Sequence, residues 1–358
     1  MARRSEHRTM LMTPGPTAVP DQVREAMATE QPNPDVDPAF ADRYEAVTDK
    51  LSRVYGTDDD VIVMGGEGIL GLEAAIASTI EPGDDVLVVA NGLYGEGFAN
   101  FVESYGGNPK VVAAPRGQPL DVEGVTEALG TSDFKAATMV HCDTPTGNHN
   151  DIEPILDRLA DREILSIVDA VSSLGGTPVP TGKIDIALGA SQKAISAPTG
   201  LTTAAVSDRA WDVIEERDPS SLYTSFLPWK DVSEGFPYTH LAANVAALDG
   251  ALDLLLDEGL TAVYDRHERA AQRCRQRGGE MGLDLYPAEE LSSPTVTAFH
   301  VPGRATEIQR TVADRHDITL ATGLGDMADD ILRVGHMGYN ANVGKVERTM
   351  DAIEDVLD

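Results

Sequence analysis

The sequence predicts an α/β protein in which a mostly parallel sheet, flanked by helices, is followed by a smaller α+β domain. Two observations lead to this prediction. Apolar, β-branched runs alternate with helical patterns through the first part of the 358 residues, as expected of a sheet covered by helices on both faces. Beyond residue 258, long helices and short strands replace this alternation. We therefore expect an N-terminal arm at 1–17, a large domain at 18–258 and a small domain at 259–358.

The expected strands of the large domain are short apolar runs bounded by turn residues. In chain order they are 61–64, 86–90, 110–114, 136–141, 164–168, 184–189 and 202–206. Helical patterns lie between them at 69–80, 95–105, 121–129 and 152–161, and a long helix follows at 239–258. In the small domain we expect a helix at 261–279, short strands near 294–301, a helix at 304–315 and a closing helix at 343–357.

The chain is strongly acidic, with 59 Asp and Glu against 28 Lys and Arg and a formal net charge of −31. The acidic residues are dispersed along the chain. This pattern is typical of proteins that work in concentrated salt, where counterions screen the repulsion between carboxylates. We expect a halophilic protein, with an ordinary acidic enzyme as the alternative. Such a field repels nucleic acid and anionic membranes, so neither is an expected partner.

Sequence patterns also indicate the compartment. No window approaches the roughly 18 apolar residues of a membrane span, and the N-terminus lacks the apolar core of a secretory signal. The only cysteines, Cys142 and Cys274, have no spacing typical of a metal site or a disulfide framework. We therefore expect a cytoplasmic protein without a metal.

A glycine-rich turn follows the first expected strand of the large domain. Residues 66–71 read Gly-Glu-Gly-Ile-Leu-Gly, and a helical pattern comes next, which together predict an anion cradle at a helix N-terminus. A dinucleotide site would also need an acid at the end of the second strand, but that strand ends in Ala90, Asn91 and Gly92. The acids Asp84 and Asp85 lie at its other end, so a nicotinamide site is disfavoured.

A carboxylate and a lysine follow two later strands. Asp169 ends the run ILSIVD, and Lys193 follows the run IDIALGASQ. Groups at the carboxyl ends of neighbouring strands meet in the crevice where such folds bind ligands. Pyridoxal chemistry needs this pair, because the lysine forms a Schiff base with the aldehyde and the aspartate keeps the pyridine nitrogen protonated. A surface lysine and a helix-capping aspartate are the alternative that spacing leaves open.

Five stretches, in order from about residue 11 to the C-terminus, resemble signatures of the class V aminotransferases of pyridoxal-phosphate fold type I, the alanine–glyoxylate and serine–pyruvate group. They are TPGPTAVPDQVREAM, HCDTPTGNHNDIEPI, IVDAVSSLGG, GASQKAISAPTG and RVGHMG. The resemblance implies a mostly parallel seven-stranded sheet and a pyridoxal 5′-phosphate cofactor. It also implies a homodimer or homotetramer with shared active sites.

The resemblance assigns residues to this site. Lys193 corresponds to the Schiff-base lysine, Asp169 to the partner of the ring nitrogen, and Tyr94 to the aromatic residue that stacks on the ring. Thr144 lies near the ring hydroxyl, and Thr239 reaches the cofactor phosphate of the neighbouring subunit. Further cofactor contacts are expected from Glu67, Gly68 and Gln192, and substrate contacts from Arg333, which binds the carboxylate, and from Gly15.

One departure changes the expected cofactor. The family's phosphate cup reads Gly-Ser-Gly-Thr, whereas here Glu67 and Ile69 replace the two hydroxyl residues. Two unit charges about 4 Å apart repel by roughly 4 kcal/mol at an effective dielectric constant of 20, so a phosphate beside Glu67 is disfavoured. One subgroup, the pyridoxamine–pyruvate aminotransferases, has a similar glutamate-bearing loop and uses the unphosphorylated vitamin as a substrate. The alternative is that Glu67 simply caps the helix.

These observations predict amino transfer between pyridoxamine and a small 2-keto acid such as pyruvate, giving pyridoxal and alanine through a Schiff base at Lys193. The subgroup has a second arginine between two glycines where this chain has Leu324, so the keto acid is an open point. The main alternative is a phosphate-dependent alanine–glyoxylate or serine–pyruvate type enzyme, and the second is a non-catalytic vitamin B6-binding protein. A cysteine desulfurase is disfavoured, because neither cysteine lies on an expected mobile loop.

Overall fold

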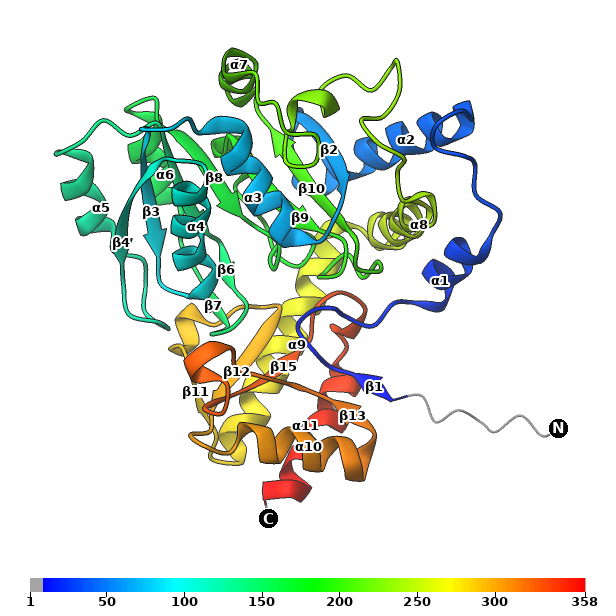
Figure 1. Ribbon diagram of the computed structural model, residues 1–358. Coiled ribbons are helices and arrows are strands. Elements are labelled where there is room, and N and C mark those ends of the chain that lie inside the picture. The colour runs from blue at the N-terminus through cyan, green and yellow to red at the C-terminus, as the bar shows by residue number, and fades with distance from the viewer. Residues whose placement is uncertain (1–8, 358) are drawn as a thin grey trace.

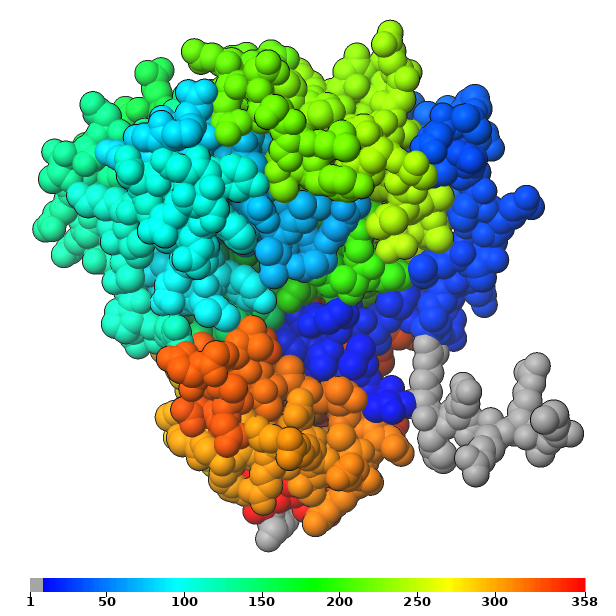
Figure 2. All heavy atoms as spheres, in the orientation of Figure 1, coloured from blue at the N-terminus to red at the C-terminus, as the bar shows by residue number. Residues whose placement is uncertain are grey.

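The computed structural model describes residues 9–357, so residues 1–8 of the expected arm lie outside the described residues. Figure 1 shows a large α/β body and a smaller body beneath it, with α9 (Leu260–Glu280) running down into the smaller one. The space-filling view in Figure 2 shows the N-terminal segment lying where the two bodies meet. Within the described part of the chain, no helix is long and apolar enough to cross a membrane.

The large body is built on a seven-stranded sheet of order β2-β10-β9-β8-β5-β3-β4. Only β10 runs antiparallel to its neighbours, which confirms the predicted, mostly parallel sheet. The strands are β2 (Asp60–Gly65), β3 (Asp85–Ala90), β4 (Asn108–Ala113), β5 (Ala136–Val140), β8 (Leu165–Asp169), β9 (Ile186–Ala190) and β10 (Leu201–Val206). The central strands are buried along their length because helices cover both faces, which is why they read as continuous apolar runs.

The helices of the large body are α1 (Asp21–Ala28), α2 (Pro38–Tyr55), α3 (Gly68–Thr79), α4 (Leu93–Ser104), α5 (Val122–Leu129), α6 (Glu153–Ala160), α7 (Asp208–Arg217) and α8 (Ala242–Glu258). The short strands β6 (Cys142–Asp143) and β7 (Asn148–His149) pair with each other. Helix α8 begins at Ala242, three residues later than the predicted start at 239. The reason is local, because the His240 ring hydrogen-bonds the Val63 carbonyl at 3.0 Å and accepts from the Leu241 N–H at 2.8 Å.

The small body has a four-stranded antiparallel sheet of order β11-β12-β15-β14, packed against α9, α10 (Ala305–His316) and α11 (Val343–Leu357). Its strands are β11 (Asp284–Leu285), β12 (Val296–His300), β14 (Ala321–Thr322) and β15 (Ile331–Gly335). Short 3-10 turns lie at Thr181–Lys183, Leu227–Trp229, Glu289–Leu291, Gly325–Met327 and Gly338–Asn340.

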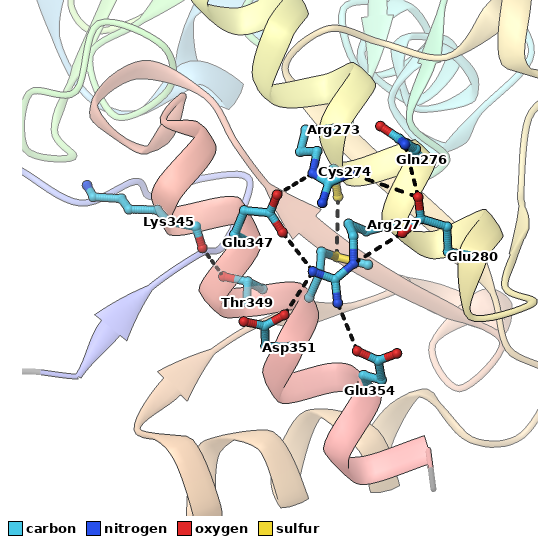
Figure 3. A network of polar contacts seen from close by, with 11 residues as sticks. Arg273, Cys274, Gln276, Arg277, Glu280, Lys345, Glu347, Thr349, Asp351 and Glu354 are labelled. Atoms are coloured by element: carbon cyan, nitrogen blue, oxygen red, sulfur yellow. Dashed lines mark hydrogen bonds and ion pairs between the residues drawn. The ribbon is translucent and has the colours of Figure 1, made fainter.

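An ionic network joins α9 to α11 (Figure 3). The Arg277 guanidinium donates to Glu347, Asp351 and Glu354 over 2.7–2.8 Å, and its side chain is only 12% exposed. Arg273 also pairs with Glu347. This ionic network lies on the small body, away from the sheet of the large body.

The chain enters the fold through the small body. Strand β1 (Met10–Leu11) pairs in parallel with β13 (Ile318–Thr319), and the following residues cross to the large body. The domain boundaries that we expect at residues 17 and 258 stay a prediction. The described part of the arm contacts the small body at one end and the large body at the other.

Candidate active site

Two strand ends bring the predicted pair together. Asp169 is the last residue of β8, and Lys193 follows β9, which lies beside β8 in parallel. Both side chains line one pocket. Its lining residues are Glu67, Gly68, Ile69, Leu72, Tyr94, Thr144, Asp169, Val171, Ser172, Gln192 and Lys193. All predicted site residues except Gly15, Thr239 and Arg333 are in this lining.

The half-buried Lys193 side chain donates a hydrogen bond from its amine to the Pro14 carbonyl at 3.0 Å. Burial lowers the pKa of Lys193 to about 8, and the nearby Arg333 charge acts in the same direction. Asp169 opposes the shift. A lysine with this pKa is partly neutral near physiological pH, so its lone pair is available to act as a nucleophile or a base.

The Asp169 carboxyl is held by a hydrogen bond from the Val171 N–H to Oδ1 at 2.9 Å. Burial raises its pKa to about 6, against the effects of that hydrogen bond and of Lys193. A buried carboxylate gains stability from a cation brought close to it. A protonated ring nitrogen would be such a cation, so the site fits the ring of a B6 vitamer at this end.

Glu67 and Gln192 form another part of the pocket lining, which we call its second end. Glu67 caps α3 by accepting from the Ile69 N–H at 3.2 Å, and its second oxygen accepts from Gln192 Nε2 at 3.3 Å. Gln192 is 4% exposed, and its Oε1 is buried without a hydrogen-bond partner. The capping role and the contact to Gln192 coexist, since each uses a different Glu67 oxygen.

Side chains between the two ends complete the pocket. Tyr94, in the first turn of α4, is half-buried, and burial raises the pKa of its phenol. The Thr144 hydroxyl bonds the Ser172 hydroxyl. The sequence analysis did not name Val171 and Ser172, although their position directly after the Asp169 strand end is a signal that would have found them.

Arg333 lies in β15 of the small body and is 7% exposed. Its Nε donates to the Thr322 carbonyl at 2.7 Å and its Nη1 to the Thr144 carbonyl at 3.3 Å. Burial lowers its pKa to about 10, so the guanidinium remains charged at neutral pH. These contacts place the cation beside Thr144, one of the pocket residues.

The sequence analysis missed two charged residues, Asp143, which acts on Arg333, and Arg116, which acts on Asp143. Asp143 is fully buried, and one of its oxygens accepts from Thr146 Oγ1 at 2.6 Å while the other has no partner. Arg116, on the loop after β4, pairs with Asp326 of the small body and with Glu96. Arg116 and Asp326 are far apart in sequence, so no local pattern indicates their contact, whereas the Asp143 contact to Thr146 is local.

Thr239 and Gly15 lie outside the pocket lining. Thr239 is exposed, and its hydroxyl donates to Asp35 at 2.9 Å, so a contact to a neighbouring subunit's cofactor stays a prediction. Gly15 instead packs directly on the Lys193 side chain.

The cysteines have the character of structural thiols. Both are buried, and burial raises the pKa of Cys142 to about 11 and that of Cys274 to about 12. Such thiols are protonated at neutral pH and therefore poor nucleophiles. Within residues 9–357, no group of His, Cys, Asp and Glu side chains is arranged to hold a metal ion.

Comparison with known proteins places this site in a family. The family model described as aminotransferase class-V matches residues 10–333. An uncharacterized aminotransferase of Methanocaldococcus jannaschii is 37% identical, over 92% of this chain and 88% of the relative. The pyridoxamine–pyruvate transaminase of Mesorhizobium japonicum is 34% identical, over 86% of this chain and 81% of the relative.

A solved structure agrees with these sequence matches. The ureidoglycine–glyoxylate aminotransferase of Bacillus subtilis superposes with a TM-score of 0.94 at 29% identity, covering 99% of this chain and 94% of the other. The family model spans most of the sequence, so membership of the family is supported by more than one relative. The chain belongs to the class V aminotransferase family and is a transaminase of fold type I.

Proposed function

We propose that the protein transfers an amino group between pyridoxamine and a small 2-keto acid such as pyruvate, giving pyridoxal and alanine. The observation that carries the proposal is the end of the pocket formed by Glu67 and Gln192. There Glu67 supplies a carboxylate, and Gln192 supplies a buried carbonyl oxygen without a partner. A pyridoxamine–pyruvate transaminase is also among the similar proteins.

The hydrogen-bond roles at this end support a hydroxymethyl group over a phosphate. Gln192 must turn its amide NH₂ toward Glu67, because a carboxylate only accepts, and this leaves Oε1 as an acceptor in need of a donor. A hydroxymethyl group can donate one hydrogen bond, whereas a phosphate dianion has none to donate. A dianion would also meet the Glu67 charge, at a cost of several kcal/mol if the charges were about 4 Å apart in a medium of dielectric constant 20.

The opposite end supplies the chemistry. A bound B6 vitamer provides a conjugated ring that accepts the electron pair released when a C–H bond breaks. Asp169 holds the proton on the ring nitrogen. The neutral Lys193 amine takes a proton from the C4′ carbon and delivers it to the substrate carbon. Arg333 binds the keto-acid carboxylate with its two-pronged guanidinium.

A phosphate-dependent enzyme of the glyoxylate type is the second candidate. One observation favours it: α3 begins at Gly68 within the pocket, and a helix N-terminus attracts an anion even when Glu67 caps it. Glyoxylate aminotransferases are also among the similar proteins. A non-catalytic B6-binding role is less favoured, because the lowered pKa of Lys193 prepares it for proton transfer.

The test compares pyridoxamine with pyridoxamine phosphate as amino donors to pyruvate, with alanine formation as the readout. We expect kcat/KM for pyridoxamine to exceed that for the phosphate ester by at least about tenfold, or 1.4 kcal/mol. Glu67→Ser should reverse this preference, and the isosteric Glu67→Gln should reduce it. A wild-type preference for the phosphate ester would favour the second candidate, and the absence of turnover with any donor would favour the non-catalytic role.

We also infer that the protein works in concentrated salt and assembles as a homodimer or homotetramer. The net charge of −31 supports the first point, since self-repulsion is relieved by counterions. Exposed Thr239 supports the second, as a side chain available to a neighbouring subunit. Sedimentation and thermal unfolding at a series of KCl concentrations test both inferences.

A further inference from the structure

Residues Met12–Thr17, which we call the strap, are bonded both to the segment that carries Lys193 and to the strand that carries Arg333. At one end, the Gly335 N–H of β15 donates to the Met12 carbonyl at 2.7 Å, two residues beyond Arg333. At the other end, the Thr17 N–H donates to the Gln192 carbonyl at 3.0 Å. The Thr17 hydroxyl donates to the Lys193 carbonyl at 3.1 Å. The strap thus spans the two bodies.

The strap packs closely against Lys193 on one side and against β15 on the other, and each of these contacts requires a glycine. A Cβ on Gly15 would lie 2.5 Å from Cδ, 2.6 Å from Nζ and 2.7 Å from Cε of Lys193. A Cβ on Gly335 would lie 2.1 Å from the Thr13 carbonyl carbon and 2.2 Å from Pro14 N. Any larger residue at either position would therefore push the strap or the lysine out of place.

The strap also determines where the amine points. The amine N–H has an acceptor in the Pro14 carbonyl, at 3.0 Å. One N–H is thereby fixed in direction, which restricts where the lone pair of the neutral amine can point. Met12, two residues before Pro14, is bonded to the β15 strand that carries Arg333.

We propose that the strap is a positioning element that sets the Lys193 amine relative to the substrate carboxylate on Arg333, with Gly15 and the Pro14 carbonyl as its contact points. The proposal rests on the roles given to Lys193 and Arg333 under the proposed function. It goes beyond them because it assigns the alignment of these two groups to a segment about 180 residues away from the lysine in sequence.

The test uses Gly15→Ala, with Gly83→Ala as the matched control. Gly15 has φ +126 and Gly83 has φ +99, so both substitutions strain the backbone, but a Cβ on Gly83 meets nothing within 4 Å. Displacing a catalytic group by about 1 Å costs on the order of 100-fold, and we expect that loss in kcat for Gly15→Ala. Pyridoxamine affinity should change less than about threefold, because the ligand does not need the amine to bind.

A second readout does not depend on turnover. Lys193 in the ligand-free protein is labelled with acetic anhydride over a range of pH, and the modified peptide is quantified by mass spectrometry. In the wild type and in Gly83→Ala, labelling should have its midpoint near pH 8. In Gly15→Ala, the displaced amine should shift this midpoint toward the ordinary lysine value of about 10.4.

Thr17→Val provides a variant without steric overlap, in case Gly15→Ala does not fold. It removes the hydroxyl bonds to the Lys193 carbonyl and to Ser196 Oγ, and we expect a loss in kcat of about three- to tenfold with the same direction of labelling shift. Unchanged labelling and an unchanged kcat in both folded variants would overturn the proposal. Failure of the proposed function is a distinct result, since it would appear as a wild-type preference for the phosphate ester or as the absence of turnover with any donor, and neither changes the labelling comparison.

Discussion

The two ends of the pocket differ in how they are built. The end with Asp169 and Lys193 is formed by two buried strand ends, and both side chains have strongly shifted pKa values. The end with Glu67 and Gln192 is formed at a helix N-terminus, where Glu67 is partly exposed. Under the proposed function, the sheet fixes the chemistry, whereas a few replaceable side chains select the form of vitamin B6.

The largest expected effect comes from removing the amine. Lys193→Ala should lower kcat at least about 10³-fold, because general acid–base catalysis contributes 10²- to 10⁴-fold and the nucleophile is lost as well. The loss should be equal for phosphorylated and unphosphorylated donors, and circular dichroism should show an intact fold. Retention of wild-type turnover would contradict the role given to this residue.

A substitution at the end of the pocket with Glu67 and Gln192 should change the affinity for each amino donor and leave kcat nearly unchanged. Gln192→Leu removes the unpartnered acceptor and the donor to Glu67 while keeping similar bulk. We expect pyridoxamine affinity to fall about tenfold, the value of one buried hydrogen bond of about 1.4 kcal/mol, with kcat nearly unchanged. Affinities are measured by isothermal titration calorimetry. An equal loss for the phosphate ester would show that this end does not discriminate.

The pH profile tests whether the lysine acts in its neutral form. Because the pKa of Lys193 is lowered to about 8, kcat/KM should rise as pH increases through about 8 and then level off, since deprotonation produces the base. The midpoint should be the same for both donors, because it belongs to the end of the pocket that they share. A profile that falls over this range would contradict the assignment.

The smallest effect is expected in a region remote from both ends. Arg277→Ala breaks the network between α9 and α11 (Figure 3) and should lower the free energy of unfolding by about 1 kcal/mol, with less effect in concentrated salt. Arg304→Ala is the control, since its only ion pair, among the described residues, spans 4.0 Å and is exposed. Urea unfolding measures both, and donor preference should not change in either variant.

The fold and the Asp169–Lys193 pair could be predicted from local sequence. Alternating runs specify parallel strands, and strand order then brings consecutive strand ends together. The start of α8 was misplaced because the His240 contact to Val63 overrides a continuous helical pattern. The strap and the Arg116–Asp326 pair could not be predicted, because they depend on contacts between distant segments.

The most direct test of the account is the ratio of two dissociation constants. Ligand-free protein in concentrated salt is titrated with pyridoxal and with pyridoxal phosphate, and heat and absorbance are recorded. The account predicts that pyridoxal binds at least about tenfold more tightly, a difference of 1.4 kcal/mol. Tighter binding of pyridoxal phosphate, at the same lysine, would contradict the claim that Glu67 and Gln192 select the unphosphorylated vitamin.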